Sequence, residues 1–192
     1  MTFSEADSGP SIETRRLHLR PVTAPDLDQL HELDADPEVR RFLDQPNAPT
    51  RQESVRALHR FLVRHGPQAE PAFWAAERKA DGSFLGWFHL RPVGDQPFTF
   101  DLGYRLRRAA WGRGYATEGA SALLHRAFKT LGAQRVVAHA LEANGASQRV
   151  LEKVGMQLRE HFLHRGELPA VNYSLEKGSY LTPSHTSKCS QP

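Results

Sequence analysis

A strand-like segment, a loop bracketed by two glycines and a long amphipathic helix follow one another near the middle of this chain, and this succession most constrains its fold. The strand is predicted from Phe98 to Leu106, and the helix from Gly114 to Leu131, with Gly132 ending it. The helix is predicted because its apolar residues form one stripe at helical spacing: Ala116, Ala120, Leu123, Leu124, Ala127, Phe128 and Leu131. The pattern indicates a helix that buries one face beside a sheet.

The remaining segments complete a single mixed α/β domain. Further strands are predicted at residues 16–20, 73–78, 84–91, 135–141, 157–164 and 171–177. Further helices are predicted at residues 26–33, 50–64 and 146–154, the second opening on a capping box formed by Thr50 and Glu53. We expect one α/β (α+β) domain over residues 12–180, with disordered ends at 1–11 and 181–192.

Composition excludes several classes of protein. A chain of 192 residues with 39% hydrophobic and 24% charged residues is typical of one soluble globular domain. It contains no apolar run near the roughly 20 residues that span a bilayer, and its start lacks the regions of a signal peptide. We therefore expect a cytoplasmic protein with no membrane partner. A net charge of +3 is too small to indicate nucleic-acid binding.

Charge is distributed unevenly along the chain. Six acids and no lysine or arginine lie between residues 21 and 38: Asp26, Asp28, Glu32, Asp34, Asp36 and Glu38. Five arginines and one acid, Glu118, lie between residues 103 and 126: Arg105, Arg107, Arg108, Arg113 and Arg126. This distribution suggests that one end of the molecule attracts an anion and the other a cation, and the alternative for the acidic run is a solvated helix face.

The loop Trp111–Ala116 has the chemistry of an anion site. The first backbone N–H groups of a helix lack internal acceptors and carry partial positive charge, and glycines allow a ligand close to the backbone. Arg107, Arg108 and Arg113 surround the loop, so a phosphate-bearing ligand is expected. The pattern is neither a dinucleotide fingerprint, because Thr117 stands at the third glycine position, nor a P-loop. A plain turn before a core helix is the alternative.

The segment Asn144–Met156 contains a second pattern. Asn144 is placed to cap a short helix that Gly155 ends. Asn144 also directly follows the predicted strand 135–141, and ligands of α/β sheets gather at strand ends.

These two segments, together with "TRRLHLRP", "DLGYRL" and "RGELPAVNYSL", resemble the GNAT superfamily of N-acetyltransferases, and most closely the branch typified by ribosomal-protein N-terminal acetyltransferases. The five motifs occur in order between about Ile12 and Tyr180. The resemblance implies a mixed, mostly antiparallel sheet of about six to seven strands, flanked by helices and splayed at the acetyl-CoA site. It implies acetyl-CoA as co-substrate, no metal, and cofactor contacts from Leu106, Arg107, Trp111, Gly112, Arg113, Gly114, Tyr115, Ala116 and Asn144.

Two positions depart from the superfamily pattern. Trp111 stands where the acetyl-CoA signature has Gln or Arg, which removes one possible hydrogen bond to a phosphate. Leu151 stands where many members carry the tyrosine that protonates the leaving thiolate, and a leucine has no proton to give.

Acetyl transfer to an amine requires a proton acceptor, an oxyanion donor and a proton for the thiolate. Asp101, on the strand leading to the glycine loop, is the candidate base; a water chain or Glu118 could replace it, and Asp101 could instead be a solvent-facing strand residue. The hydroxyls of Ser147 and Tyr104 are the candidate acids, and a backbone N–H near Leu106 is the expected oxyanion donor. The histidines match no metal motif, because His161 and His164 would lie on opposite faces of a strand.

The sequence therefore predicts an acetyl-CoA-dependent N-acetyltransferase. The expected acceptor is a protein N-terminal amine, with the acidic residues 26–38 available to attract a basic chain. A small-molecule amine, such as a polyamine or an aminoglycoside, is the alternative within this class. A CoA-binding sensor without catalysis is the alternative outside it, and a homodimer remains open.

Overall fold

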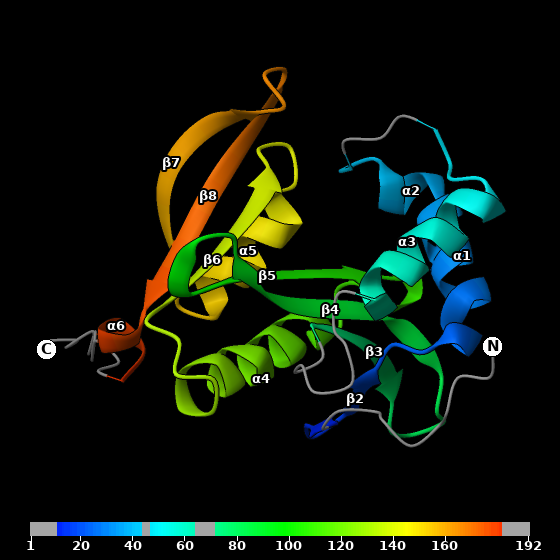
Figure 1. Cartoon of the computed structure of the whole chain (residues 1–192), viewed down its shortest axis with the longest axis horizontal. Helices are drawn as coiled ribbons and strands as arrows, with labels where there is room; N and C mark the ends of the chain where they lie inside the picture. Colours follow the sequence, from blue (N-terminus) through cyan, green and yellow to red (C-terminus); the bar gives the residue numbers. More distant parts are fainter. Residues whose placement is uncertain (1–10, 44–46, 64–71, 182–192) are drawn as a thin grey trace, which may run out of the picture.

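A computed structural model describes residues 11–43, 47–63 and 72–181, so nearly all of the chain expected to be disordered at the two ends lies outside the described residues. One sheet of eight strands forms the frame, in the order β1-β2-β3-β4-β5-β6-β8-β7 (Figure 1). The strands are β1 (Ile12–Glu13), β2 (Leu17–Pro21), β3 (Phe73–Arg78), β4 (Phe84–Val93), β5 (Gln96–Leu106), β6 (Arg135–Leu141), β7 (Gln157–His164) and β8 (Leu168–Glu176). The helices are α1 (Leu27–Ala35), α2 (Pro37–Arg40), α3 (Arg51–Val63), α4 (Tyr115–Lys129), α5 (Gly145–Lys153) and α6 (Lys177–Leu181).

The sheet is mixed because one of its neighbouring pairs, β5 with β6, is parallel. That pairing covers Thr99–Asp101 against Arg135–Val137 and then stops, although β5 continues to Leu106 and β6 to Leu141. The two strands therefore diverge beyond Asp101 and leave a V-shaped gap in the middle of the sheet. The expectation of a splayed, mostly antiparallel sheet is confirmed.

Helices cover both faces of the sheet. On β3, Trp74 and Ala76 belong to the core beneath α4, whereas Phe73 and Ala75 belong to a second core beneath α1 and α3. These residues alternate along one strand, so the two cores lie on opposite faces. Figure 1 shows α1, α2 and α3 together at one side of the molecule, and α4 packed along the sheet away from them. Each candidate side chain on β5 therefore faces either the α4 side or the α1–α3 side.

The close packing of α4 depends on one glycine. A β-carbon at Gly119 would lie 2.3 Å from Cζ of Phe88 on β4, so only glycine lets the helix approach this closely. Gly132, with φ +71°, follows the end of the helix as predicted. Thr50 and Glu53 form the expected capping box, with Thr50 N–H donating to Glu53 and Glu53 N–H donating back to Thr50 Oγ1 at 3.3 Å.

The sequence prediction missed three short elements. The sheet has eight strands rather than six to seven, because β1 is two residues long and too short to show a period. Helix α2 is a four-residue turn that begins at Pro37, and α6 extends the ordered chain through Leu181. Among the described helices, none is long and apolar enough to cross a membrane.

Candidate functional site

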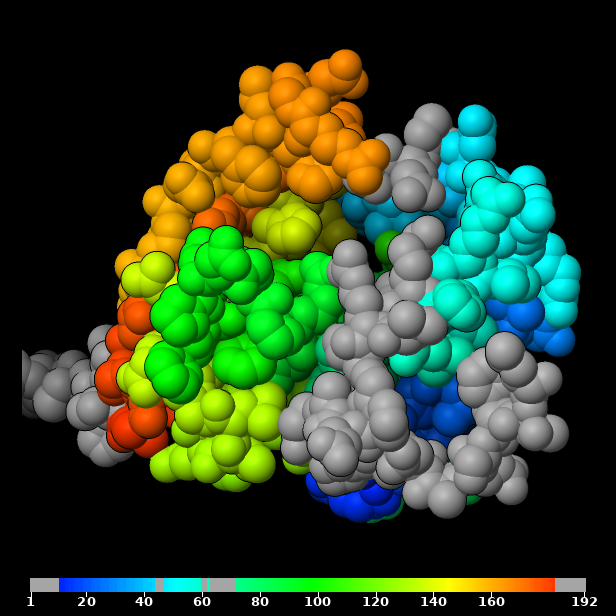
Figure 2. Space-filling model, viewed as in Figure 1, coloured from blue at the N-terminus to red at the C-terminus, as the bar shows by residue number. Residues whose placement is uncertain are grey.

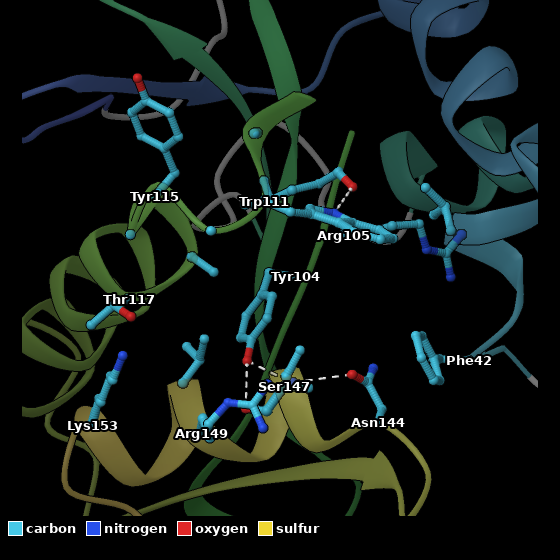
Figure 3. A pocket seen from close by; sticks show the side chains of 18 of the residues that line it. Phe42, Tyr104, Arg105, Trp111, Tyr115, Thr117, Asn144, Ser147, Arg149 and Lys153 are labelled. Atoms are coloured by element: carbon cyan, nitrogen blue, oxygen red, sulfur yellow. Dashed lines mark hydrogen bonds between the residues drawn. The ribbon is translucent and has the colours of Figure 1, made fainter. Parts of the chain in front are cut away.

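A cavity of about 350 Å³ lies on the α4 side of the sheet, beside the gap between β5 and β6. Its walls come from α2, the end of β5, the loop before α4, and α5 (Figure 3). The expected cofactor residues that line it are Leu106, Trp111, Gly112, Gly114, Tyr115, Ala116 and Asn144. Arg107 and Arg113 are not among the lining residues. The candidate acids Tyr104 and Ser147 line the cavity, and Asp101 does not.

The N-terminus of α4, which we call its mouth, is suited to bind an anion. Gly112 and Gly114 have φ values of +69° and +78°, which favour glycine, and Gly114 caps the helix with no side-chain hydrogen bond to it. The N–H groups of the first turn are therefore without a capping acceptor, at the positive end of the helix dipole. A β-carbon at Gly112 would meet no atom within 4 Å, so the space over the loop is open. A phosphate group could accept these hydrogen bonds.

Trp111 braces the loop from the wall of the cavity. Its indole N–H donates to the carbonyl oxygen of Leu106 at 2.8 Å and ties the loop to the end of β5. The N–H of Arg107 donates to Leu85 on β4 at 2.8 Å. Because successive N–H groups of a strand point to opposite edges, the N–H of Leu106 points into the gap. The predicted oxyanion donor thus lies at the gap.

The acidic and basic runs of the sequence pair with each other. Ion pairs join Arg105 to Asp34, Arg107 to Glu32 and Arg108 to Asp36. The expectation of separate anion-attracting and cation-attracting ends is therefore wrong for these six residues, because each run neutralises the other. Their pairing fastens α1 and the start of α2 to the end of β5.

Two cations that the sequence reasoning missed lie on the cavity wall. Arg149 and Lys153 project from α5 toward the cavity, across from α4 (Figure 3). Within the part of the chain that the structure describes, neither makes an ion pair or a side-chain hydrogen bond. Their spacing of four residues, on the helix that Asn144 opens, was the available signal, since such residues share a helix face.

Tyr104 and Ser147 meet inside the cavity. Their hydroxyl oxygens are 3.0 Å apart, and the Tyr104 hydroxyl also lies 3.2 Å from the Ser147 carbonyl oxygen (Figure 3). Burial raises the pKa of Tyr104 to about 12, although the hydrogen bond with Ser147 opposes the shift. The phenol is therefore protonated at neutral pH. Asn144 is a cap, as expected, since its Oδ1 accepts from Ser147 N–H at 3.1 Å.

Asp101 faces the α1–α3 side of the sheet. Its carboxylate accepts from Nε2 of His89 at 3.0 Å and forms an ion pair with Arg91. Burial alone would raise the pKa of Asp101, but the contacts with His89 and Arg91 outweigh it and lower the pKa well below its usual range. A carboxylate that holds its charge so firmly is a weak proton acceptor.

Glu118 has a structural role. Its carboxylate accepts from the Thr14 hydroxyl and from N–H and Nε of Arg16, each at 2.7 Å. These bonds attach the start of the domain to α4. They leave Glu118 unsuited to the role of alternative base, and they go beyond the dipole-complementing role expected of a first-turn acid.

A second cavity, of about 180 Å³, lies on the α1–α3 side of the sheet. Phe73 and Trp87 form aromatic walls, with Asp34, His89 and Arg91 among its polar residues. Arg105 lines both cavities, so they adjoin at the end of β5. Among the described residues, no three His, Cys, Asp or Glu side chains converge as metal ligands would.

The diverging strands, the glycine loop at the helix mouth and the paired cavities define an acyltransferase that uses a CoA thioester. The chain belongs to the GNAT acetyltransferases: the model of the acetyltransferase (GNAT) domain matches residues 16–157. It is 30% identical over 186 residues to the FsC-acetyl coenzyme A-N(2)-transacetylase of Aspergillus fumigatus, covering 90% of this chain and 78% of that protein. Acetyl-CoA-dependent N-acetyl transfer is the activity of this family.

Solved structures share the fold. A GNAT-family acetyltransferase from Bacillus anthracis superposes with a TM-score of 0.77 at 20% identity, covering 88% of this chain and 99% of that one. Spermidine N-acetyltransferase from Vibrio cholerae, in complex with CoA and spermine, superposes with a TM-score of 0.73 at 15% identity, covering 88% of this chain and 100% of that one. A ribosomal-protein-serine acetyltransferase-like structure from Vibrio cholerae gives a TM-score of 0.69 at 20% identity, covering 87% and 97%.

Proposed function

We propose that the protein acetylates a primary amine of a small molecule, with acetyl-CoA as donor. The observation that carries this choice is the second cavity, whose volume of about 180 Å³ and aromatic walls suit a small substituent. Glu32, Asp34 and Asp36 already pair with arginines of this chain, so they attract a basic protein chain less than free carboxylates would. The relative from Aspergillus fumigatus is itself described as an N(2)-transacetylase.

Acetyl-CoA would bind in the cavity of about 350 Å³. Its pyrophosphate would accept from the N–H groups at the mouth of α4, and Arg149 and Lys153 would pair with its phosphates. The bound thioester supplies the acetyl group and the thiolate leaving group. The N–H of Leu106 would donate to the thioester oxygen as negative charge develops on it.

Tyr104 and Ser147 replace the hydroxyl that is absent at Leu151. Leu151 is 1% exposed and belongs to the core, so it packs against the sheet instead of lining the cavity. The neighbouring hydroxyls of Tyr104 and Ser147 form one hydrogen-bonded pair that can deliver a proton to the leaving thiolate.

A protein N-terminal amine is the second candidate acceptor. It is favoured by the order of the five motifs, which matches the branch of ribosomal-protein N-terminal acetyltransferases. The cytoplasmic location expected from the sequence stays a prediction, and a homodimer stays open.

The test measures binding and transfer separately. Calorimetric titration with acetyl-CoA measures the first, and release of free thiol in the presence of glycinamide, spermidine or a peptide beginning with serine measures the second. We expect binding, and faster thiol release with a small amine than with the peptide. A peptide that is the better acceptor would favour the second candidate. Binding without thiol release from any acceptor would favour the non-catalytic sensor.

A further inference from the structure

Asp101 lies where the gap in the sheet opens. It is the last residue of β5 that pairs with β6, opposite Val137. Oδ2 of Asp101 accepts from both His89 and Arg91. Oδ1 accepts no hydrogen bond from a described residue and lies 4.0 Å from Nδ1 of His139 on β6. The carboxylate thus keeps one oxygen open toward β6.

His139 is accessible beside this open oxygen. It lies two residues beyond Val137, where β6 has already left β5, and its side chain is 51% exposed. Its ring stacks on that of His164, with centroids 5.7 Å apart and an angle of 18° between the planes. Figure 2 shows the β7–β8 hairpin (orange), which carries His164, on the opposite side of this view from α1 and α3 (blue to cyan). A small acceptor can reach His139, and the stacked ring keeps His139 oriented.

We propose that Asp101 and His139 form the binding site of the acceptor's ammonium group, and that His139 is the base that takes its proton. This inference rests on the acetyl transfer proposed above. A nitrogen at an ordinary hydrogen-bond length of about 2.9 Å from both Oδ1 and Nδ1 spans their separation at roughly a right angle. Such an ammonium donates one hydrogen bond to each residue.

The other groups at this point are unsuited to the role of base. His89 and Arg91 hold Asp101 as a firmly charged carboxylate, which binds a cation but accepts a proton poorly. Nε2 of His89 is occupied by Asp101, and its Nδ1 is buried with no partner among the described residues. His139, which is half exposed beside Oδ1 of Asp101, is an imidazole that an acceptor can reach.

These residues account for every proton that the reaction moves. The ammonium gives one proton to Nδ1 of His139, which carries its own proton on Nε2. The freed lone pair attacks the thioester carbon, the C–N bond forms and the C–S bond breaks. The amine's second proton is balanced by the one that the thiolate takes, so the products are an amide, a free thiol and one proton. His139 returns that proton to solvent, because half of its side chain is exposed.

The rate should fall at acidic pH, where an imidazole base becomes protonated. The charged and titratable groups that face His139, directly or across Asp101, are His89, Arg91, Asp101 itself and His164. The contacts with His89 and Arg91 lower the pKa of Asp101, so this carboxylate stays ionised and does not contribute to the fall.

The experiment compares His139→Gln with His161→Gln. His161 is a matched control on β7, 63% exposed, whose Nδ1 lies 2.9 Å from Glu142. With the best amine among glycinamide, spermidine and the serine peptide, we expect His139→Gln to lower kcat/KM about 100-fold and to flatten the acidic side of its pH profile. Added imidazole should restore part of the activity of His139→Ala. Affinity for acetyl-CoA, and the activity of His161→Gln, should be unchanged.

The outcomes separate this inference from the function beneath it. If His139→Gln is as active as wild type at every pH between 6 and 9, the role of His139 is overturned and the proposed acetyl transfer is left intact. A wild-type protein that binds acetyl-CoA but acetylates no amine overturns both. Asp101→Asn provides a second measurement: we expect a raised KM for the amine and unchanged affinity for acetyl-CoA. An unchanged KM would contradict the ammonium site.

Discussion

The ring of His89 lies over Gly103 so closely that a β-carbon on Gly103 would come within 2.4 Å of Cε1 of His89. The same ring donates to Asp101, two residues earlier on β5. The motif Asp101-Leu-Gly103 therefore combines an acceptor for the imidazole with the space that the imidazole needs.

Replacing Gly103 with alanine should displace this ring. The added methyl group overpacks a close contact, so we expect a loss of about 1–3 kcal/mol in the free energy of unfolding. For a chain of this size, Tm should fall by between about 2 and 12 °C in a thermal melt. Gly178→Ala in α6 is the control, because a β-carbon there meets no atom within 4 Å and should leave Tm nearly unchanged. A Tm of Gly103→Ala equal to that of wild type would contradict the close contact between Gly103 and the His89 ring.

The positive charges that hold the cofactor should be those on α5. We expect Arg149→Ala to raise the Kd for acetyl-CoA about tenfold, the loss typical of one charge-assisted hydrogen bond, and Lys153→Ala to act in the same direction. Arg107→Ala is the control: its guanidinium pairs with Glu32, so the Kd should stay within about twofold. Calorimetric titration measures all three. A larger effect at Arg107 would restore the role that the sequence pattern gave it.

The hydroxyl pair should affect turnover but not binding. Tyr104→Phe removes one of two hydrogen-bonded hydroxyls, and we expect kcat to fall at least tenfold while the Kd for acetyl-CoA is unchanged. Ser147→Ala should lower kcat less if Tyr104 is the direct donor. Steady-state rates of thiol release, with calorimetry beside them, make the comparison. Unchanged kcat in both variants would exclude the pair as the proton source.

Asp26 should make stability depend on pH. It is 2% exposed and accepts from Arg20 and from Thr23. Burial raises the pKa of Asp26, but these bonds outweigh it and leave the pKa lowered in the folded protein. The stabilisation is therefore present above the unfolded pKa of about 3.9 and is lost as pH falls through the folded value. Asp26→Asn should cost about 3 kcal/mol at pH 7 in denaturant unfolding, and less below pH 4. A difference that does not depend on pH would contradict the charge pairing.

Local patterns were enough to predict most of the frame. The helix predicted from Gly114 to Leu131 is α4, because a long apolar stripe at helical spacing has few other solutions. The cap at Asn144 and the role of Gly132 follow from chemistry within a few residues. Helix α2 escaped prediction since four residues are too few to establish a period.

Contacts between distant segments could not be read from the sequence. Three arginines pair with acids that lie 71 to 75 residues away in the sequence: Arg105, Arg107 and Arg108. A run of one charge does not reveal which residues will lie opposite it in the fold. Likewise, Asp101 and His139 meet through the parallel register of β5 and β6, which side-chain alternation leaves undetermined. The sequence identified Asp101 but not the histidines on either side of it.

The gap between β5 and β6 passes through the sheet, with the cavity of about 350 Å³ on one face and the Asp101–His139 pair on the other. Donor and acceptor can therefore enter from opposite faces of the sheet and be bound at the same time. The acetyl group can then pass directly to the amine, with no acetylated enzyme in between. A single molecule that links the sulfur of CoA to an amine through a two-carbon bridge would pass through the gap between β5 and β6. It would occupy the donor site and the acceptor site at once.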